Sequence, residues 1–142
     1  DGKTVDSISL DTFIGMAYVV EYHGIVSGEV AVEILEKAKN QNLQAAKRIL
    51  IKGDAEVSAE AAKVFAGGWN LNAWEWISNG WSWKCANGST SYILGANVVL
   101  LEGIRLSEVS EGVYFLNAAP LNLSGPDGSP CRAVLIDKER SI

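Results

Sequence analysis

The segment at residues 119–136 limits the fold more than any other part of the chain. It reads Ala-Pro-Leu-Asn-Leu-Ser-Gly-Pro-Asp-Gly-Ser-Pro-Cys-Arg-Ala-Val-Leu-Ile and holds all three of the prolines in the sequence. Glycine and proline interrupt helices and favour tight turns, so this segment predicts a strand, a turn and a second strand. The glycine-rich turn is not followed by a helix N-terminus, which argues against a phosphate-binding loop.

The apolar residues elsewhere follow two periodicities, one typical of buried strands and one of amphipathic helices. Ser27 and Ser58 are suitable N-caps for two helices. The predicted helices are Glu29–Asn40 and Ala59–Ala66, and the predicted strands are Phe13–Tyr22, Arg48–Lys52, Val98–Leu101, Val113–Leu116 and Ala133–Ile136. Helices and strands alternate early and strands dominate later, so we expect one α/β domain over residues 1–142, with a mixed sheet.

Composition excludes some classes of function. The net charge is −5 and the basic residues form no stripe, so we expect no nucleic-acid partner. No apolar run reaches the ~18 residues that a membrane-spanning helix needs, so we expect a soluble protein. The chain starts at Asp1 without a signal peptide, which fits a cytoplasmic chain, a processed secreted chain or a trimmed one.

All five tryptophans fall between residues 69 and 83, and four of them form two pairs around an Asn-Gly dipeptide. The pairs are Trp74 with Trp76 and Trp81 with Trp83, and their alternation predicts a β-hairpin with Asn79 and Gly80 as its two loop residues. A short helix over 73–78 is the competing interpretation. The rings could pack in the core, line a pocket for an aromatic small molecule, or contact a second copy of the chain.

The two cysteines, Cys85 and Cys131, leave two interpretations open. They could be two buried free thiols, or they could form a disulfide. The disulfide would add on the order of 3–4 kcal/mol to the free energy of unfolding. Two cysteines are too few to indicate the redox compartment.

Four stretches of the sequence resemble the cyclase-like metal-dependent hydrolases, the family of the bacterial kynurenine formamidases and isatin hydrolases. The resemblance lies in Asp-Gly-Lys-Thr-Val-Asp (1–6), Arg-Ile-Leu-Ile (48–51), Val-Val-Leu-Leu-Glu-Gly (98–103), and Pro-Leu-Asn-Leu (120–123) with Gly-Ser-Pro-Cys-Arg (128–132). It implies a layered β/β/α domain, shortened at its N-terminus and corresponding to the C-terminal portion of the family's domain. Within the last motif we interpret Arg132 as structural, pairing with a carboxylate or with carbonyls near the sheet.

The resemblance also implies a metal centre, which the family uses to activate water for attack on an amide or lactam carbonyl. The family's His-x-Gly-Thr-His-x-Asp motif would immediately precede Asp1, and Glu102 matches its later glutamate ligand. The family's later histidine ligand is replaced, since Thr90 stands at its place and the one histidine, His23, matches no ligand. Because catalytic zinc needs three protein ligands, we expect no bound zinc or manganese.

Two functions follow as hypotheses. The first is a non-catalytic cyclase-like scaffold that acts by binding or by assembly as a homo-oligomer. The second is a metal-dependent hydrolase of an N-formyl or cyclic amide, whose metal motif lies outside this chain. The sequence favours the first, because Glu102 is the one matching ligand.

Overall fold

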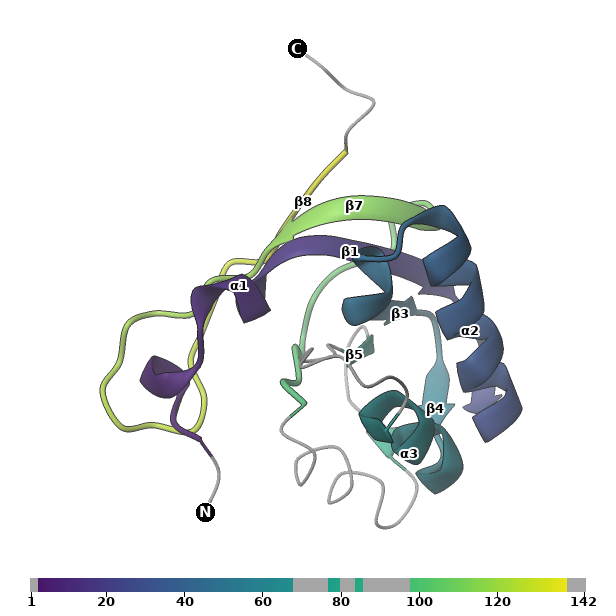
Figure 1. The fold of residues 1–142 in the computed structure, drawn as a ribbon, viewed down its shortest axis with the longest axis horizontal. Coiled ribbons are helices and arrows are strands. Elements are labelled where there is room, and N and C mark those ends of the chain that lie inside the picture. The colour runs from purple at the N-terminus through teal and green to yellow at the C-terminus, as the bar shows by residue number, and fades with distance from the viewer. Residues whose placement is uncertain (1–2, 68–76, 80–83, 86–97, 138–142) are drawn as a thin grey trace.

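The computed structural model describes residues 3–67, 77–79, 84–85 and 98–137, and these form a layered α/β fold (Figure 1). The strands are β1 (Ile14–Glu21), β2 (Gly24–Val26), β3 (Ile49–Lys52), β4 (Ala55–Val57), β5 (Ile77–Asn79), β6 (Lys84–Cys85), β7 (Gly112–Asn117) and β8 (Val134–Ile136). The helices are α1 (Leu10–Phe13), α2 (Gly28–Gln41) and α3 (Ala59–Gly67), with short 3-10 helices η1 (Val5–Ser7) and η2 (Ala45–Lys47).

Two sheets share the strands, and the chain passes from the larger sheet to the smaller one three times and returns each time. The larger sheet has the order β5-β3-β1-β7-β8 and the smaller one the order β2-β4-β6. β1, β3 and β5 are parallel neighbours, and each is followed along the chain by β2, β4 or β6, which are also parallel neighbours. β7 and β8 add antiparallel pairs, so the larger sheet is mixed, as predicted.

A glycine makes the bend between β3 and β4 possible. Gly53 has a φ of 112°, and a Cβ atom placed there would lie 2.3 Å from the Tyr22 carbonyl oxygen of the neighbouring bend. Any other residue would meet this backbone atom and would also adopt an unfavourable conformation. A hydrogen bond joins this bend to the one between β1 and β2, because the Asp54 N–H donates to Nδ1 of His23 at 3.2 Å.

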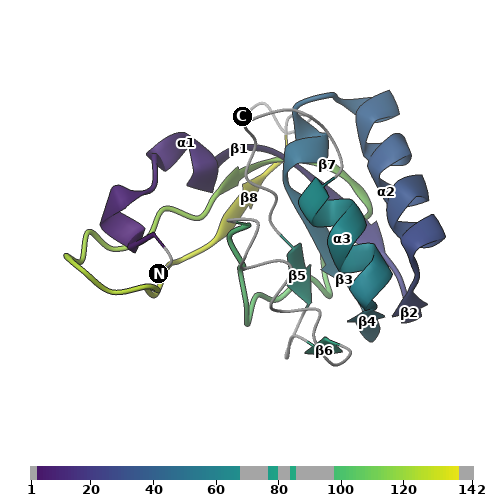
Figure 2. The ribbon, with the colours of Figure 1, turned by 60° about the horizontal axis from the view of Figure 1, so that its bottom comes forward.

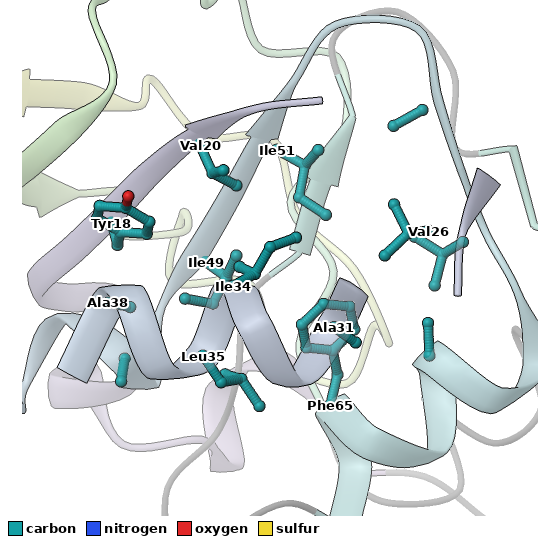
Figure 3. Packing of buried hydrophobic residues seen from close by; sticks show 14 of the residues in the cluster. Tyr18, Val20, Val26, Ala31, Ile34, Leu35, Ala38, Ile49, Ile51 and Phe65 are labelled. Atoms are coloured by element: carbon teal, nitrogen blue, oxygen red, sulfur yellow. The ribbon is translucent and has the colours of Figure 1, made fainter. Parts of the chain in front are cut away.

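The alternating side chains of β1 and β3 form two cores, one on each face of the larger sheet. Tyr18, Val20, Ile49 and Ile51 point toward α2 and α3, where they meet Ile34, Leu35 and Phe65 (Figure 3). Ala17, Val19 and Leu50 belong to the second core, together with Leu101, Leu106 and Leu116. Strands buried on both faces account for the continuous apolar runs in the sequence.

Both predicted long helices are confirmed, and they lie side by side on one face of the larger sheet (Figure 2). Ser27 Oγ accepts the Val30 N–H at 3.3 Å, and Ser58 Oγ accepts the Ala61 N–H at 3.1 Å. These bonds satisfy backbone donors that the first turn of a helix leaves unpaired. The apolar stripe of α2 is buried, as its spacing predicts, and consists of Ala31, Ile34, Leu35 and Ala38.

Arg48 ties the start of β1 to the preceding helix α1. Its side chain is 9% exposed, and its guanidinium donates to the carbonyl oxygens of Asp11, Thr12, Ile14 and Met16. Burial lowers the pKa of the guanidinium, and the charge of Asp11 acts in the opposite direction. Gly15 leaves room for this group, since a Cβ atom there would lie 2.6 Å from Nη1 of Arg48.

Two of the predicted elements are wrong. Val98–Leu101 is not a strand, and within it Leu100 forms an isolated bridge. Its apolar composition reflects burial rather than sheet pairing, because Val98 and Leu101 are each 6% exposed in the two cores. The predicted hairpin also fails, because Ile77–Asn79 pairs with β3 and Lys84–Cys85 with β4, in two different sheets.

The pairing with β3 puts Asn79 in a strand, whereas the hairpin needs it in the loop. The alternative helix over 73–78 is wrong at its last two residues, which belong to β5. Parallel pairing with a buried strand thus decides the structure here, against the local Asn-Gly signal. Trp74, Trp76, Trp81 and Trp83 lie outside the described residues, so their roles stay predictions.

A candidate ligand pocket opposite the helices

A cavity of about 940 Å3 lies on the second-core face of the larger sheet, opposite the helices. Residues 100–106 form one part of its wall and residues 128–135 another. Leu50 of β3 and Leu116 of β7 supply the wall that belongs to the sheet. The cavity therefore combines two separate segments of the C-terminal part of the chain, and its volume is within the range of small-molecule sites.

Most residues of the pocket wall are apolar, although polar atoms form nearly half of its surface, and three of its side chains are charged. Its apolar members include Leu101, Ile104, Leu106, Val109, Pro130 and Leu135. The charged members are Glu102, Arg105 and Arg132, all exposed to solvent. An apolar wall with a few polar groups is typical of a site that binds a small organic molecule and fixes its orientation.

A network of hydrogen bonds shapes the turn that leads to the 128–135 wall. Ser129 Oγ accepts the Leu121 N–H at 2.9 Å, and an antiparallel bridge joins Pro120 to Cys131. The Val5 N–H donates to the Pro126 carbonyl oxygen at 2.9 Å, which holds the N-terminal segment against the turn. In Figure 1 these two segments lie together, away from α2 and α3.

Asp6 belongs to the same contact between the N-terminal segment and the turn. A hydrogen bond with the Thr4 side chain, and weaker ones with the Gly125 backbone and the Ser124 side chain, lower the pKa of its carboxyl group. The carboxylate is solvent-exposed, so its contribution to stability is small. The two motifs that resemble the family at residues 1–6 and 120–132 therefore contact each other in the fold.

Glu102 and the Gly-Ser-Pro-Cys-Arg motif at 128–132 line the same pocket. Arg132 differs from its expected role, because its guanidinium contacts no carboxylate or carbonyl of a described residue. Arg48 performs that role instead, and the sequence gives little indication of it, since arginine is seldom buried. Arg105, which sequence reasoning did not single out, also lines the pocket.

Cys131 is a free cysteine that lines the pocket, so the disulfide with Cys85 is not formed. Burial raises the pKa of the Cys131 thiol, which makes it a weaker nucleophile at neutral pH. The two residues belong to different parts of the fold. Cys85 pairs with β4 in the smaller sheet, whereas Cys131 bridges to Pro120 beside the larger one.

The residues of the described ranges do not build a metal centre. No group of three or more histidine, cysteine, aspartate or glutamate side chains comes together among them. Glu102 is one carboxylate, whereas a catalytic zinc site uses three protein ligands. The described part of the chain therefore does not fit the metal that the resemblance implies, and His23 takes part in the backbone bend described above.

A second polar cluster lies at the carboxyl ends of β1 and β3. Tyr18 is fully buried, and its hydroxyl donates to Glu111 Oε1 at 2.9 Å. Burial, followed by the bond to Glu111 and the charge of that residue, raises the pKa of Tyr18 to about 12. Lys52 Nζ lies 3.1 Å from Glu21 Oε2 and donates to the Val109 carbonyl oxygen at 2.9 Å. Each of these groups has a partner in the fold, so the cluster is structural.

Comparisons with known proteins agree with this architecture. The chain is 30% identical over 148 residues to a kynurenine formamidase of Erythrobacter litoralis, covering 95% of this chain and 66% of that protein. It is 25% identical over 150 residues to cyclase-like protein 2 of Oryza sativa subsp. japonica, covering 95% of this chain and 55% of that protein. A kynurenine formamidase of Salinibacter ruber is 28% identical over 150 residues, with 96% and 69% covered.

Solved structures show the same fold. A potential metal-dependent hydrolase with cyclase activity superimposes with a TM-score of 0.73 at 23% identity, over 94% of this chain and 70% of that one. A predicted metal-dependent hydrolase from Bacillus stearothermophilus gives a TM-score of 0.72 at 23% identity, over 95% and 69%. No protein-family model matches the chain. Among the described helices, none has the length and apolar content needed to cross a bilayer.

Proposed function

Because the chain is homologous to the cyclase-like proteins and the kynurenine formamidases, we propose that it is a cyclase-like domain that acts by binding a small molecule. The pocket beside Glu102 carries this proposal, since it is large enough for an aromatic compound and most of its lining residues are apolar. Of the residue types that ligate metals, the pocket wall contains Glu102 and Cys131, and no group of three such side chains comes together among the described residues. The chain spans about half to two thirds of the length of these three relatives.

Assembly as a homo-oligomer stays a prediction. β8 ends the order of the larger sheet, and its residues Val134 and Ile136 are 45% and 53% exposed. An exposed apolar edge strand is a surface that proteins usually cover. Such an edge is compatible with assembly, and binding in the pocket does not depend on it.

Binding is testable with a neutral aromatic probe, 3-phenylpropanamide. Even at about 0.3 kcal/mol per non-hydrogen atom, the gain typical of drug-sized ligands, we expect a millimolar dissociation constant. The probe should shift the backbone amide resonances of residues 100–106 and 128–135 in a titration of labelled protein. Ala133→Trp should block the pocket and weaken binding at least about tenfold, because the larger ring would fill the space that the probe needs.

A matched control for that variant is Ala119→Trp. Ala119 is half-buried like Ala133, but it does not line the pocket. The Ala119→Trp variant should therefore bind the probe as the wild-type chain does. A wild-type chain whose resonances do not move at saturating probe would remove the binding proposal.

The second candidate function is metal-dependent amide hydrolysis. One observation favours it: Glu102 and the 128–132 motif, which match the family in two separate motifs, line one pocket. Two of the relatives are named kynurenine formamidases, and hydrolysis of an N-formyl aromatic compound is the activity this name describes. The metal ligands besides Glu102 would then have to come from outside the described residues.

Elemental analysis separates the two candidates. We expect well below one equivalent of zinc or manganese per chain, and no release of formate from N-formylkynurenine, because one carboxylate does not hold such an ion. About one equivalent of zinc or manganese per chain, lost in Glu102→Ala and retained in the control Glu108→Ala at another exposed glutamate, would contradict this expectation. The hydrolase would then replace the binding domain as the proposed function.

A further inference from the structure

We propose that the pocket selects organic anions, specifically a monocarboxylate attached to an apolar body. The inference rests on the proposed function, because it names the class of ligand for the same pocket. It follows from the two arginines, Arg105 and Arg132, that line the pocket together with a single carboxylate, Glu102.

The charge of the wall is opposite in sign to that of the whole chain. Two arginines and one glutamate give the pocket a formal charge of +1, whereas the net charge of the protein is −5. The wider field of the molecule therefore repels anions, and a positive pocket is not a general property of its surface. A local positive charge in a wall whose surface is about half apolar favours a ligand that combines one negative group with an apolar part.

The two guanidinium groups are available to a ligand. Neither Arg105 nor Arg132 forms an ion pair or a hydrogen bond with a described residue. Arg48 and Lys52 differ in this respect, because both donate hydrogen bonds to backbone carbonyl oxygens and Lys52 also forms an ion pair with Glu21. A guanidinium presents several donors in one plane, which suits a carboxylate better than a neutral amide.

Glu102 limits the ligand to a single negative charge. A carboxylate in the wall repels a second anionic group, so a dianion such as a phosphate monoester gains less than a monocarboxylate does. It also lies between apolar positions, Leu101 on one side and Ile104 on the other side of Gly103. The apolar residues of the wall, such as Leu106 and Leu135, accept the uncharged part of the ligand through hydrophobic contact.

The test compares three probes with one apolar body: 3-phenylpropanoate, 3-phenylpropanamide and 3-phenylpropylamine, with charges of −1, 0 and +1. The acid should bind about tenfold more tightly than the amide, and the amine more weakly than both. The preference for the acid should fall as salt rises, while binding of the amide should not change. All three titrations use the full chain and the amide resonances of the pocket wall.

Variants assign the preference to the two arginines. Arg105→Gln and Arg132→Gln should each weaken the acid about threefold, and the double variant should bind acid and amide equally. Lys47→Gln, a cation outside the pocket, is the control and should keep the full preference. The amide titration shows that each variant is folded and that its pocket is intact.

The possible results distinguish this inference from the proposed function. Equal binding of acid and amide by the wild-type chain, or tighter binding of the amine, would overturn the anion preference while leaving the binding pocket in place. A preference for the acid that survives in the double variant would overturn its assignment to Arg105 and Arg132. Absence of binding by all three probes would overturn the proposed function together with the inference.

Discussion

Replacing Arg48 by methionine is expected to lower the free energy of unfolding by about 3 kcal/mol or more. The methionine keeps most of the apolar stem, so the change removes the guanidinium and its bonds to the carbonyl oxygens of Asp11, Thr12, Ile14 and Met16. A buried acceptor left without a partner costs about 1–3 kcal/mol, and relief from burying the charge offsets part of the total. Urea unfolding followed by circular dichroism measures the difference.

Lys47→Met is the control for the loss of one positive charge. Lys47 adjoins Arg48 and is half-buried, and its replacement should change the free energy of unfolding by no more than about 0.5 kcal/mol. Equal stabilities of Arg48→Met and Lys47→Met would show that the carbonyl contacts contribute nothing to folding.

Gly15 gives an independent check of the same contact. A Cβ atom at Gly15 would lie 2.6 Å from Nη1 of Arg48, so Gly15→Ala should displace the guanidinium. If the clash is with Arg48, the penalty of Gly15→Ala should shrink in the Arg48→Met background. The loss of stability that Gly15→Ala still causes in the Arg48→Met background measures the cost of a φ of 153° for a residue with a side chain.

The sequence predicts the elements whose local signals agree with their burial. α2 has a serine cap and an apolar stripe on one face, and both are present in the structure. β1, β3 and β7 are predicted within one or two residues at each end, because their central residues are apolar and are buried in β1 and β3 and mostly half-buried in β7. β2 and β4 were missed, since each is three residues long and their strand character comes from pairing with each other.

The failures have a common physical cause, which is that partners distant in sequence decide the outcome. Ile77–Asn79 becomes a parallel neighbour of β3, although Asn-Gly locally favours a hairpin. Val98–Leu101 has the composition of a strand, yet its buried side chains fill the two cores without forming a sheet ladder. Neither outcome can be read from a window of a few residues.

For the candidate site, too, the sequence predicts some residues, and the fold decides which of them come together. Glu102 and the 128–132 motif were identified through the resemblance, but only the fold shows that they line one pocket. Arg105 carries no motif and was not found from the sequence. Arg48 and Arg132 were hard to tell apart because an arginine in a sequence gives no sign of being buried. The structure separates them, with Arg48 9% exposed and bonded to carbonyls and Arg132 exposed in the pocket.

Raising the pH from about 10 to about 12 is expected to destabilise the fold through Tyr18. The pKa of this buried hydroxyl is raised to about 12, whereas an unfolded tyrosine has a pKa of about 10. Below pH 10 the residue is neutral in both states, so its contribution to stability is fully present. Between the two values the unfolded chain loses the proton that the folded chain keeps. The free energy of unfolding should therefore fall by about 2–3 kcal/mol.

Tyr18→Phe isolates this contribution from the other groups that titrate in the same range. The variant loses the bond to Glu111, which costs about 1 kcal/mol at neutral pH, but it no longer has a proton to lose. Its urea-unfolding free energy should fall less steeply above pH 10 than that of the wild-type chain, and the two stabilities should converge or cross. Every other group of the chain is common to both proteins and cancels in the comparison. Parallel pH profiles would mean that Tyr18 ionises as readily in the fold as in the unfolded chain, and that its contact with Glu111 does not hold the proton.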